Sequence, residues 1–438
     1  MLKPEPTAGK TDWFVHDRFG LFIHWGLYSV AARHEWVKNF ERMTDEEYQK
    51  YFNHFDPDLY DPDAWAKAAK DAGMKYAVIT TKHHEGFCLW DSKLTDYKAT
   101  NTPAGRDLLK PFVEAFRKQG IKIGFYYSLI DWHHPEFPVD GRHPQRDDDE
   151  FKKQSKNRDI KKYAEYMHAQ VRELLTQFGK IDVLFFDFSY SGQEYLGMKG
   201  KGKEDWQSEK LIKMIRKLMP DVVINDRTEI PQDLYTPEQF QPRGWVHVDG
   251  KPVVWEACQT LNGSWGYHRD NSGVFGEEKI SFAWKSSEIL VKMLIDTVSK
   301  GGNVILNVGP TARGQFEPKA LERLHDIGEW MKLHSRSIYG ATQSGFKAPQ
   351  DCRFTQNENR LFLHIFSWPF KIIHLDNMAD RVEYAQLLND GSEIKTQRHD
   401  PKKEHTSMSE KVDSKTLTLE LPIQKPDVTV PVIELFLK

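Results

Sequence analysis

Residues 181–187, from Ile181 to Asp187, read IDVLFFD, and our prediction of the fold starts from this stretch. Five of its seven residues are apolar, and a short run of this kind is typical of a strand that is buried on both faces. Such strands belong to parallel sheets whose two faces are covered by helices. The run ends in a carboxylate, Asp187, so the sequence must explain why a buried strand carries an acid at its end.

Similar apolar runs recur up to about residue 340 and alternate with amphipathic segments. The segments repeat apolar residues every three to four positions and tend to stop at glycine, as surface helices do. The alternation of strands and helices over this length favours a closed (β/α)8-like barrel of the TIM type over an open sheet. The predicted strands are Phe19–Trp25, Lys75–Thr81, Ile121–Ser128, Ile181–Asp187, Asp221–Asp226, Pro252–Ala257 and Gly302–Gly309.

The pattern changes beyond about Gly345. Four short apolar runs follow one another with turns between them and no long helical pattern, which predicts a C-terminal antiparallel β-sandwich. The runs are RLFLHIFSW (360–368), FKIIHLD (370–376), TLTLELP (416–422) and VTVPVIELFLK (428–438). We therefore predict two domains, a catalytic α/β barrel at residues 1–342 and a β-sandwich at residues 343–438.

Composition excludes several classes of function. The net charge is −3 over 438 residues, so nothing favours nucleic acid or an anionic membrane as a partner. Three cysteines give no disulfide framework, and the N-terminal residues lack the apolar core of a signal peptide. We expect a cytoplasmic protein from the sequence as written, or a secreted, periplasmic or lysosomal one if a leader has been removed. The oligomeric state is left open.

In a parallel barrel, the residues just past the carboxyl ends of the strands meet on one face. Here these positions and the loops that follow them carry acids, imidazoles, an arginine and aromatic rings: His24, Glu35, Trp36, His83, His84, Tyr127, Asp187, Arg227 and Glu256. This pattern favours a catalytic role for Asp187 over the alternative that it merely caps the next helix.

Two carboxylates on opposite walls of such a pocket suit glycoside hydrolysis. Carboxyl groups about 5–5.5 Å apart retain the anomeric configuration, whereas a separation of about 6.5–9.5 Å leaves room for a water that inverts it. The residues alone do not fix that distance. Asp187 is the predicted nucleophile, because Arg227 or a nearby histidine favours its ionised form. Glu256 is the predicted acid, because its apolar neighbours favour a raised pKa.

Seven blocks of this sequence, taken in order, resemble glycoside hydrolase family 29, the retaining α-L-fucosidases. The resemblance covers residues 18–339, most of the chain. The seven blocks are RFGLFIHWG (18–26), HEW (34–36), TKHHEGFCLWDS (81–92), DVLFFDF (182–188), INDR (224–227), WEACQTLNGSWGY (255–267) and GGNVILNVGP (301–310). The resemblance implies a (β/α)8-like barrel followed by a β-sandwich. It also implies an exo-acting enzyme that releases terminal α-L-fucose from fucosylated oligosaccharides or glycoconjugates, through a covalent fucosyl-enzyme and without cofactor or metal.

The same resemblance assigns roles to residues. Asp187 matches the nucleophile and Glu256 the acid/base, with Glu35 as the alternative acid/base. The residues expected to contact fucose are His24, Glu35, Trp36, His83, His84, Tyr127 and Arg227, with Trp265 as an apolar wall for the C6 methyl group. The chain departs from the family pattern after the nucleophile, where Phe188 stands in place of a common glycine. Phe185 replaces a tryptophan that often lies two residues before the nucleophile.

Other functions remain open from the sequence. The barrel could serve another terminal sugar, such as a galactose analogue, or bind carbohydrate without hydrolysing it, although the presence of both acids argues against the latter. His83, His84, His133 and His134 follow no known zinc spacing, so no metal is expected. GGNVILNVGPTARG lacks the ending of a phosphate-binding loop. The linkage preference, and the roles of two long loops at residues 131–159 and 228–250, are not predicted.

Overall fold

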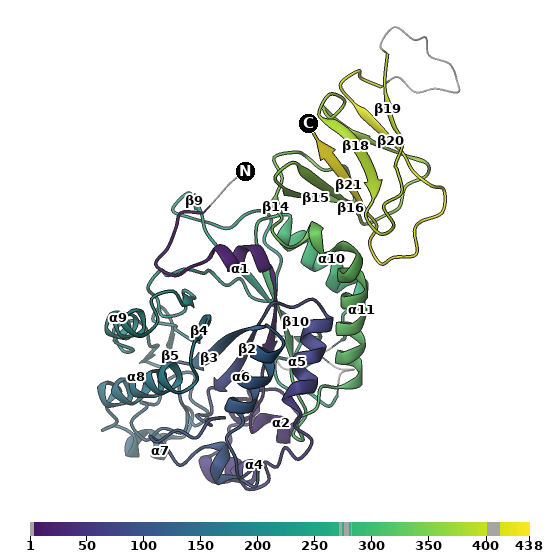
Figure 1. The fold of residues 1–438 in the computed structure, drawn as a ribbon. Coiled ribbons are helices and arrows are strands. Elements are labelled where there is room, and N and C mark those ends of the chain that lie inside the picture. The colour runs from purple at the N-terminus through teal and green to yellow at the C-terminus, as the bar shows by residue number, and fades with distance from the viewer. Residues whose placement is uncertain (1–3, 271–273, 276–279, 282, 401–411) are drawn as a thin grey trace.

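The computed structural model describes residues 4–270, 274–275, 280–281, 283–400 and 412–438. Figure 1 shows a curled parallel sheet wrapped by helices, with a smaller all-β unit standing on one end of it. The N-terminal part therefore has the α/β architecture that the sequence predicts, and the C-terminal part has antiparallel sheets.

Seven parallel strands form one sheet in the order β10-β13-β1-β2-β3-β4-β7. Because every pair in the sheet is parallel, all seven carboxyl ends lie at one edge. The strand bounds are β1 (Phe19–Ile23), β2 (Tyr76–Lys82), β3 (Lys122–Ser128), β4 (Val183–Asp187), β7 (Val223–Ile224), β10 (Glu256–Thr260) and β13 (Asn303–Val308).

The gap between β7 and β10 is occupied by an irregular segment, residues 234–238. On the β7 side, an isolated parallel bridge joins Leu234 to Asn225. On the β10 side, one such bridge joins Tyr235 to Trp255 and another joins Glu238 to Cys258. This segment takes the place of an eighth strand, so the predicted (β/α)8-like barrel is confirmed in this curled form. It also carries Glu238 to the carboxyl end of the barrel.

Helices cover the outside of the sheet. The longer ones are α5 (Pro62–Asp71), α6 (Leu109–Lys118), α8 (Ile160–Gln177), α9 (Ser208–Leu218), α10 (Ser287–Val298) and α11 (Pro318–His334). Shorter elements are α1 (Asp12–Asp17), α2 (Tyr28–Ala31), α3 (Val37–Phe40), α4 (Asp45–Asn53), α7 (Asp149–Gln154), η1 (Ala99–Asn101) and η2 (Ser335–Ser337). Among the described helices, none is both long and apolar enough to cross a bilayer.

Alternation along the strands separates two apolar layers. Tyr126 of β3 and Phe185 of β4 belong to the cluster inside the barrel, together with Phe22 of β1. Tyr127 and Phe186 belong to the larger cluster between the sheet and the helices. Strands buried on both faces explain why their sequences are nearly continuous apolar runs.

The C-terminal unit contains two antiparallel sheets around an apolar cluster of its own. One sheet has the order β14 (Thr342–Gln343), β15 (Cys352–Asn357), β16 (Arg360–Ile365), β21 (Val432–Leu437) and β18 (Val382–Leu387), and the other has the order β17 (Ile372–Leu375), β20 (Leu417–Glu420) and β19 (Thr396–Arg398). Three two-stranded ribbons lie in loops: β5 (Glu194–Tyr195) with β6 (Met198–Lys199), β8 (His247–Val248) with β9 (Lys251–Pro252), and β11 (Val274–Phe275) with β12 (Ile280–Ser281).

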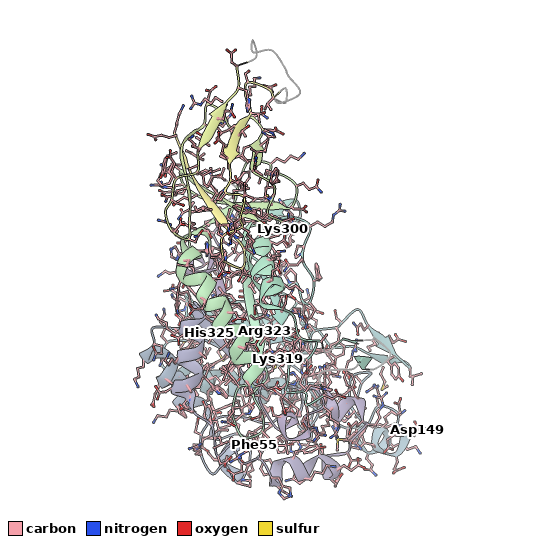
Figure 2. The ribbon with its side chains drawn as sticks, turned by 90° about the vertical axis from the view of Figure 1, so that its right-hand side faces the viewer. Phe55, Asp149, Lys300, Lys319, Arg323 and His325 are labelled. Carbon is pink, nitrogen blue, oxygen red and sulfur yellow. The ribbon has the colours of Figure 1, made fainter. Side chains whose placement is uncertain are left out.

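The sandwich lies at the amino end of the barrel strands. In Figure 2, Lys300 lies close to the sandwich and Asp149, at the start of α7, lies at the far end of the barrel. The indole nitrogen of Trp255, just before β10, donates to the carbonyl oxygen of Lys300 at 3.2 Å. The loop that carries Asp149 follows β3. The carboxyl ends of the strands, where a barrel builds its site, therefore face away from the sandwich.

Candidate active site

A small cavity of about 80 Å³ opens at the carboxyl end of the barrel. Of the ten predicted site residues, the structure brings eight together on its walls: His24, Glu35, Trp36, His83, His84, Asp187, Arg227 and Trp265. Phe22, Tyr126, Phe185, Phe188, Glu238 and Cys258 complete the lining. Glu256 and Tyr127 do not line it. We call this cavity the sugar pocket.

Asp187 is the last residue of β4, and its carboxylate is surrounded by donors. The Tyr126 hydroxyl donates to Oδ2 at 2.8 Å, and Nη1 of Arg227 lies 3.4 Å from Oδ1. Burial, together with the charge of Asp187, raises the pKa of Tyr126 well above its usual value, so the phenol keeps the proton that it donates. These contacts hold the carboxylate of Asp187 in one orientation. The strand therefore delivers a fixed carboxylate to the pocket.

The histidines on the pocket wall are held in defined orientations. Burial, followed by the proximity of His83, lowers the pKa of His24 and His84 well below the usual value, so both are neutral at pH 7. Nδ1 of His24 lies 2.7 Å from Oδ1 of Asn307, whose amide nitrogen donates to the Trp265 carbonyl oxygen. Nδ1 of His24 is therefore the donor, which leaves Nε2 as an acceptor for a sugar hydroxyl.

Consecutive histidines enter the same pocket because the end of β2 is irregular. The pairing of β2 with β3 shifts register between Thr80 and Lys82, immediately before His83 and His84. The two imidazole rings lie with their centroids 3.9 Å apart. A regular strand would have pointed them to opposite faces, so the irregular end is what allows both histidines to enter the pocket.

Glu35, Trp36 and Trp265 form another wall. The backbone N–H of Gly266 donates to Oε2 of Glu35 at 2.9 Å and thereby ties the loop after β1 to the segment after β10. The Trp36 ring packs against His84, and the Trp265 ring packs against His24, with centroid distances of 5.1 Å in both pairs. Together these contacts give the pocket one acidic and two aromatic surfaces.

Glu238 supplies a second carboxylate beside Asp187. Nη2 of Arg227 lies 3.0 Å from Oε2 of Glu238, so one guanidinium bridges the two acids. Burial raises the pKa of Glu238, Arg227 opposes the rise, and the negative charge of Asp187 adds to it. The Glu238 side chain remains 42% exposed, compared with 17% for Asp187. Glu238 is thus the more accessible of the two acids, and its pKa is raised.

Glu238 was not among the predicted site residues. The unexplained length of the loop at residues 228–250 was the one local signal, and it did not single out this residue. Glu238 reaches the site through its bridge to Cys258, a contact between segments that the chain pattern does not encode. Only a prediction of how the barrel closes between β7 and β10 would have found it.

The structure contradicts the prediction that Glu256 is the acid/base. The predicted strand ended just after Glu256, at Ala257, but β10 begins at Glu256 and runs to Thr260. Glu256 pairs with Asn303, the first residue of β13, and accepts a hydrogen bond from the hydroxyl of Tyr76, the first residue of β2. It is fully buried at the amino end of the barrel, opposite to the sugar pocket. Burial, partly offset by the Tyr76 hydrogen bond, raises the pKa of Glu256 to about 8.

The prediction for Tyr127 is also wrong, because the neighbouring tyrosine occupies the site. Tyr126 points into the barrel, whereas Tyr127 points toward the helices and donates its hydroxyl to Oε1 of Gln170 on α8 at 2.7 Å. The ammonium of Lys82 lies 4.5 Å from the Tyr127 ring centroid. Tyr127 thus supports the strand from behind, and Tyr126 contacts Asp187.

Enzymes that hydrolyse glycosidic bonds commonly use a pair of carboxylic side chains that flank the bond, one to protonate the leaving oxygen. A barrel whose carboxyl end holds Asp187 and Glu238 around one arginine, inside a pocket with aromatic walls, defines this chain as a glycoside hydrolase.

Comparison with known proteins identifies the family. The family pattern described as alpha-L-fucosidase matches residues 5–336. Mouse tissue alpha-L-fucosidase is 30% identical over 361 residues, which cover 75% of this chain and 71% of the mouse protein. Alpha-L-fucosidase isoenzyme 1 from Paenibacillus thiaminolyticus is 47% identical, with a TM-score of 0.88 and 98% of each chain covered. The chain belongs to the alpha-L-fucosidase family, glycoside hydrolase family 29, as its sequence blocks predict.

A second solved structure bears on the chemistry. The family 29 alpha-L-fucosidase of Bacteroides thetaiotaomicron, determined as a trapped covalent intermediate with 2-fluoro-fucosyl fluoride, is 27% identical to this chain. Its TM-score is 0.80, and the likeness covers 99% of this chain and 100% of that one.

Proposed function

We propose that the chain is an exo-acting, retaining α-L-fucosidase that releases terminal α-L-fucose from fucosylated oligosaccharides or glycoconjugates. The observation that carries the proposal is the pair of carboxylates bridged by Arg227, with Asp187 inside the sugar pocket and Glu238 at its edge. The covalent intermediate of the Bacteroides enzyme supports a two-step reaction.

In the first step, the Asp187 carboxylate attacks the anomeric carbon and forms an ester, while Glu238 gives its proton to the departing oxygen. Formation of the ester removes the negative charge of Asp187, which is one cause of the raised pKa of Glu238. Glu238 is then a stronger acid, and its ionised form removes a proton from the water that hydrolyses the ester. One residue thus serves as acid and then as base, because the charge of its neighbour changes.

The remaining pocket groups fit the features of fucose. The carboxylate of Glu35 and the free Nε2 of His24 accept hydrogen bonds from hydroxyls, and His83 lies beside them. Phe22 and Trp265 form an apolar surface, with ring centroids 5.9 Å apart, that suits the C6 methyl group. A hexose such as galactose would place an additional hydroxyl against that surface, so the pocket favours the deoxysugar. Its small volume suits one terminal residue and an exo mode of attack.

The test uses aryl α-L-fucosides with good and poor leaving groups. Asp187→Gly should lose nearly all turnover, and azide should restore it by attacking in place of the carboxylate. Glu238→Ala should slow substrates with poor leaving groups far more than activated ones, because only the former need the proton. Glu35→Gln is the matched variant of the alternative acid. If Glu35→Gln gives the leaving-group dependence and Glu238→Ala does not, the acid/base proposal is wrong.

A further inference from the structure

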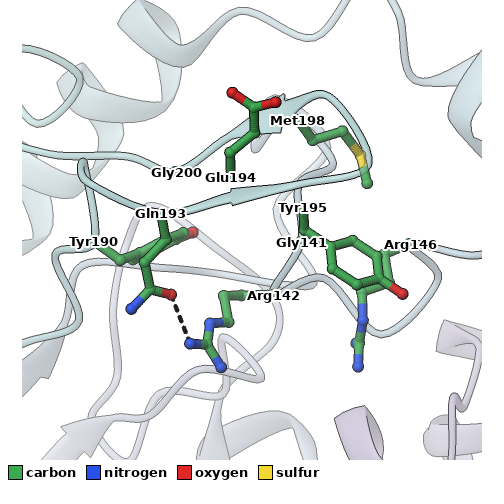
Figure 3. Close-up of a pocket in the computed structure, with 9 residues that line it drawn as sticks. All are labelled: Gly141, Arg142, Arg146, Tyr190, Gln193, Glu194, Tyr195, Met198 and Gly200. Atoms are coloured by element: carbon green, nitrogen blue, oxygen red, sulfur yellow. Dashed lines mark hydrogen bonds between the residues drawn. The ribbon is translucent and has the colours of Figure 1, made fainter.

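Two larger cavities lie next to the sugar pocket. One, of about 660 Å³, shares Glu35, Trp36, Phe188, Glu238 and Trp265 with the sugar pocket, so it receives whatever group is attached to the terminal sugar. The other, of about 430 Å³, is shown in Figure 3. Arg142 lines both of these larger cavities, so the two adjoin at its side chain, and the first of them adjoins the sugar pocket.

The second cavity lies between two loops at the carboxyl end of the barrel. One loop follows β3 and carries Arg142 and Arg146, and the other follows β4 and contains the β5–β6 ribbon. The hydroxyl of Tyr195, on the ribbon, lies 3.2 Å from Oδ1 of Asp147 and joins the two loops. We call this space the arginine cavity, defined by Arg142, Arg146, Tyr190, Gln193 and Tyr195.

Both guanidinium groups in this cavity have neutral partners. Nη2 of Arg142 donates to Oε1 of Gln193 at 2.6 Å, and its Cζ lies 5.5 Å from the Phe188 ring centroid. Arg146 donates to Oδ1 of Asn39 at 3.2 Å, and its Cζ lies 5.9 Å from the Tyr195 ring centroid. Within the described part of the chain, no carboxylate lies within 4 Å of either guanidinium.

The acids nearest in sequence are already engaged elsewhere. Asp140 forms an ion pair with Lys201 and accepts from Tyr190, and Asp147 lies 3.0 Å from Nε of Arg42. In Figure 3, the Glu194 carboxylate points away from both guanidinium groups. Glu194 lines the cavity without pairing with either arginine, so the two half-buried positive charges, held in place by aromatic rings and amide groups, have no ion-pair partner among the described residues.

We propose that the arginine cavity binds an anionic substituent, a carboxylate or a sulfate, on the acceptor part of a glycan whose fucose occupies the sugar pocket. A planar guanidinium matches the oxygens of such groups, and charge-assisted hydrogen bonds are the stronger kind. Arg142 packs against Phe188, the residue that follows the nucleophile. Phe188 also lines the sugar pocket, so an anion bound by Arg142 belongs to the part of the glycan next to the reacting bond. The inference rests on the proposed fucosidase function, whose acceptor it specifies.

The experiment compares three fucosylated oligosaccharides with one common core, which is neutral, sialylated or sulfated. We expect the kcat/KM ratio of the preferred anionic substrate to the neutral one to be about tenfold, as expected of a charge-assisted hydrogen bond, and to fall as salt is added. The sialylated and sulfated substrates distinguish the two sources of negative charge. Arg142→Gln and Arg146→Gln should each lower the ratio severalfold, whereas Arg172→Gln, an exposed arginine on α8, should leave it unchanged.

The outcomes separate the two proposals. If none of the three substrates is hydrolysed, the fucosidase function fails. If it is hydrolysed but neither anionic substrate is preferred, or if the preference survives both arginine substitutions, the arginine cavity has no such role and the fucosidase function stands.

Discussion

Replacing Glu256 by glutamine should stabilise the protein in a pH-dependent manner. In the folded protein, burial raises the pKa of Glu256 from 4.5 to about 8, although the hydrogen bond from Tyr76 opposes the rise. Between these two values the unfolded chain releases the proton and the folded chain keeps it. The free energy of unfolding contributed by this group therefore falls as pH rises from about 4.5 to about 8, and it is constant above that.

The magnitude follows from the size of the shift. One pKa unit corresponds to about 1.4 kcal/mol, so the native protein loses about 3 kcal/mol at pH 7 and about 5 kcal/mol above pH 8, relative to its stability near pH 4.5. Glutamine has the same shape and stays neutral at every pH, so Glu256→Gln avoids this loss. Its Oε1 can accept from Tyr76, and the second polar atom has no hydrogen-bond partner in the native protein either.

The assay is urea unfolding, followed by tryptophan fluorescence at pH 5, 7 and 8.5. The advantage of Glu256→Gln over the native protein should be small at pH 5 and grow to several kcal/mol at pH 8.5. Glu114→Gln, which changes an exposed acid on α6, is the control and should show no such growth. Fucosidase turnover should be retained in Glu256→Gln, because the side chain lies at the opposite end of the barrel. Loss of turnover in a folded variant, or an advantage that does not change with pH, would refute this reasoning.

Three further predictions concern the site and its support. The activity on fucosides with poor leaving groups should decline as pH rises through the raised pKa of Glu238, and this decline should be absent from the pH profile of Glu238→Gln. Phe188→Gly should relieve backbone strain, because Phe188 has a φ of +79°, a left-handed value that glycine favours. The same change should raise KM for glycans more than for aryl fucosides, because the cavity next to the sugar pocket loses the Phe188 ring from its wall. Lys82→Met should lower the free energy of unfolding by about 3–5 kcal/mol, because Asp131 is left buried without its ion-pair partner. The control Lys67→Met, on the exposed face of α5, should change it by less than about 1 kcal/mol, and thermal unfolding measures both.

The sequence predicts the part of the site that depends on strand ends. The apolar run before Asp187 has a clear end, so its predicted last residue is also the last residue of β4. The strand before His24 ends at Ile23, two residues earlier than predicted, and His24 still lies at its carboxyl end. In both cases one chain segment contains the whole signal, and the barrel geometry supplies the rest.

Where the sequence fails, the deciding contact is long-range. The predicted strand at residues 252–257 overlaps β10 only at Glu256 and Ala257. The sequence of β10, EACQT, is largely polar although every residue is buried. The strand was therefore predicted too early, and Glu256 was assigned to the wrong end of the barrel. Tyr126 and Tyr127 are identical in type, so only the register of β3 decides which one meets Asp187.

The most direct test of the account is to identify the residue that carries the sugar. The protein should be incubated with a 2-fluoro-fucosyl fluoride, digested, and its peptides analysed by mass spectrometry. The account predicts one fluorofucosyl group per chain, attached to the peptide that contains Asp187, with a parallel loss of turnover. A label on Glu35, Glu238 or Glu256 instead, or full inactivation without any covalent label, would contradict it.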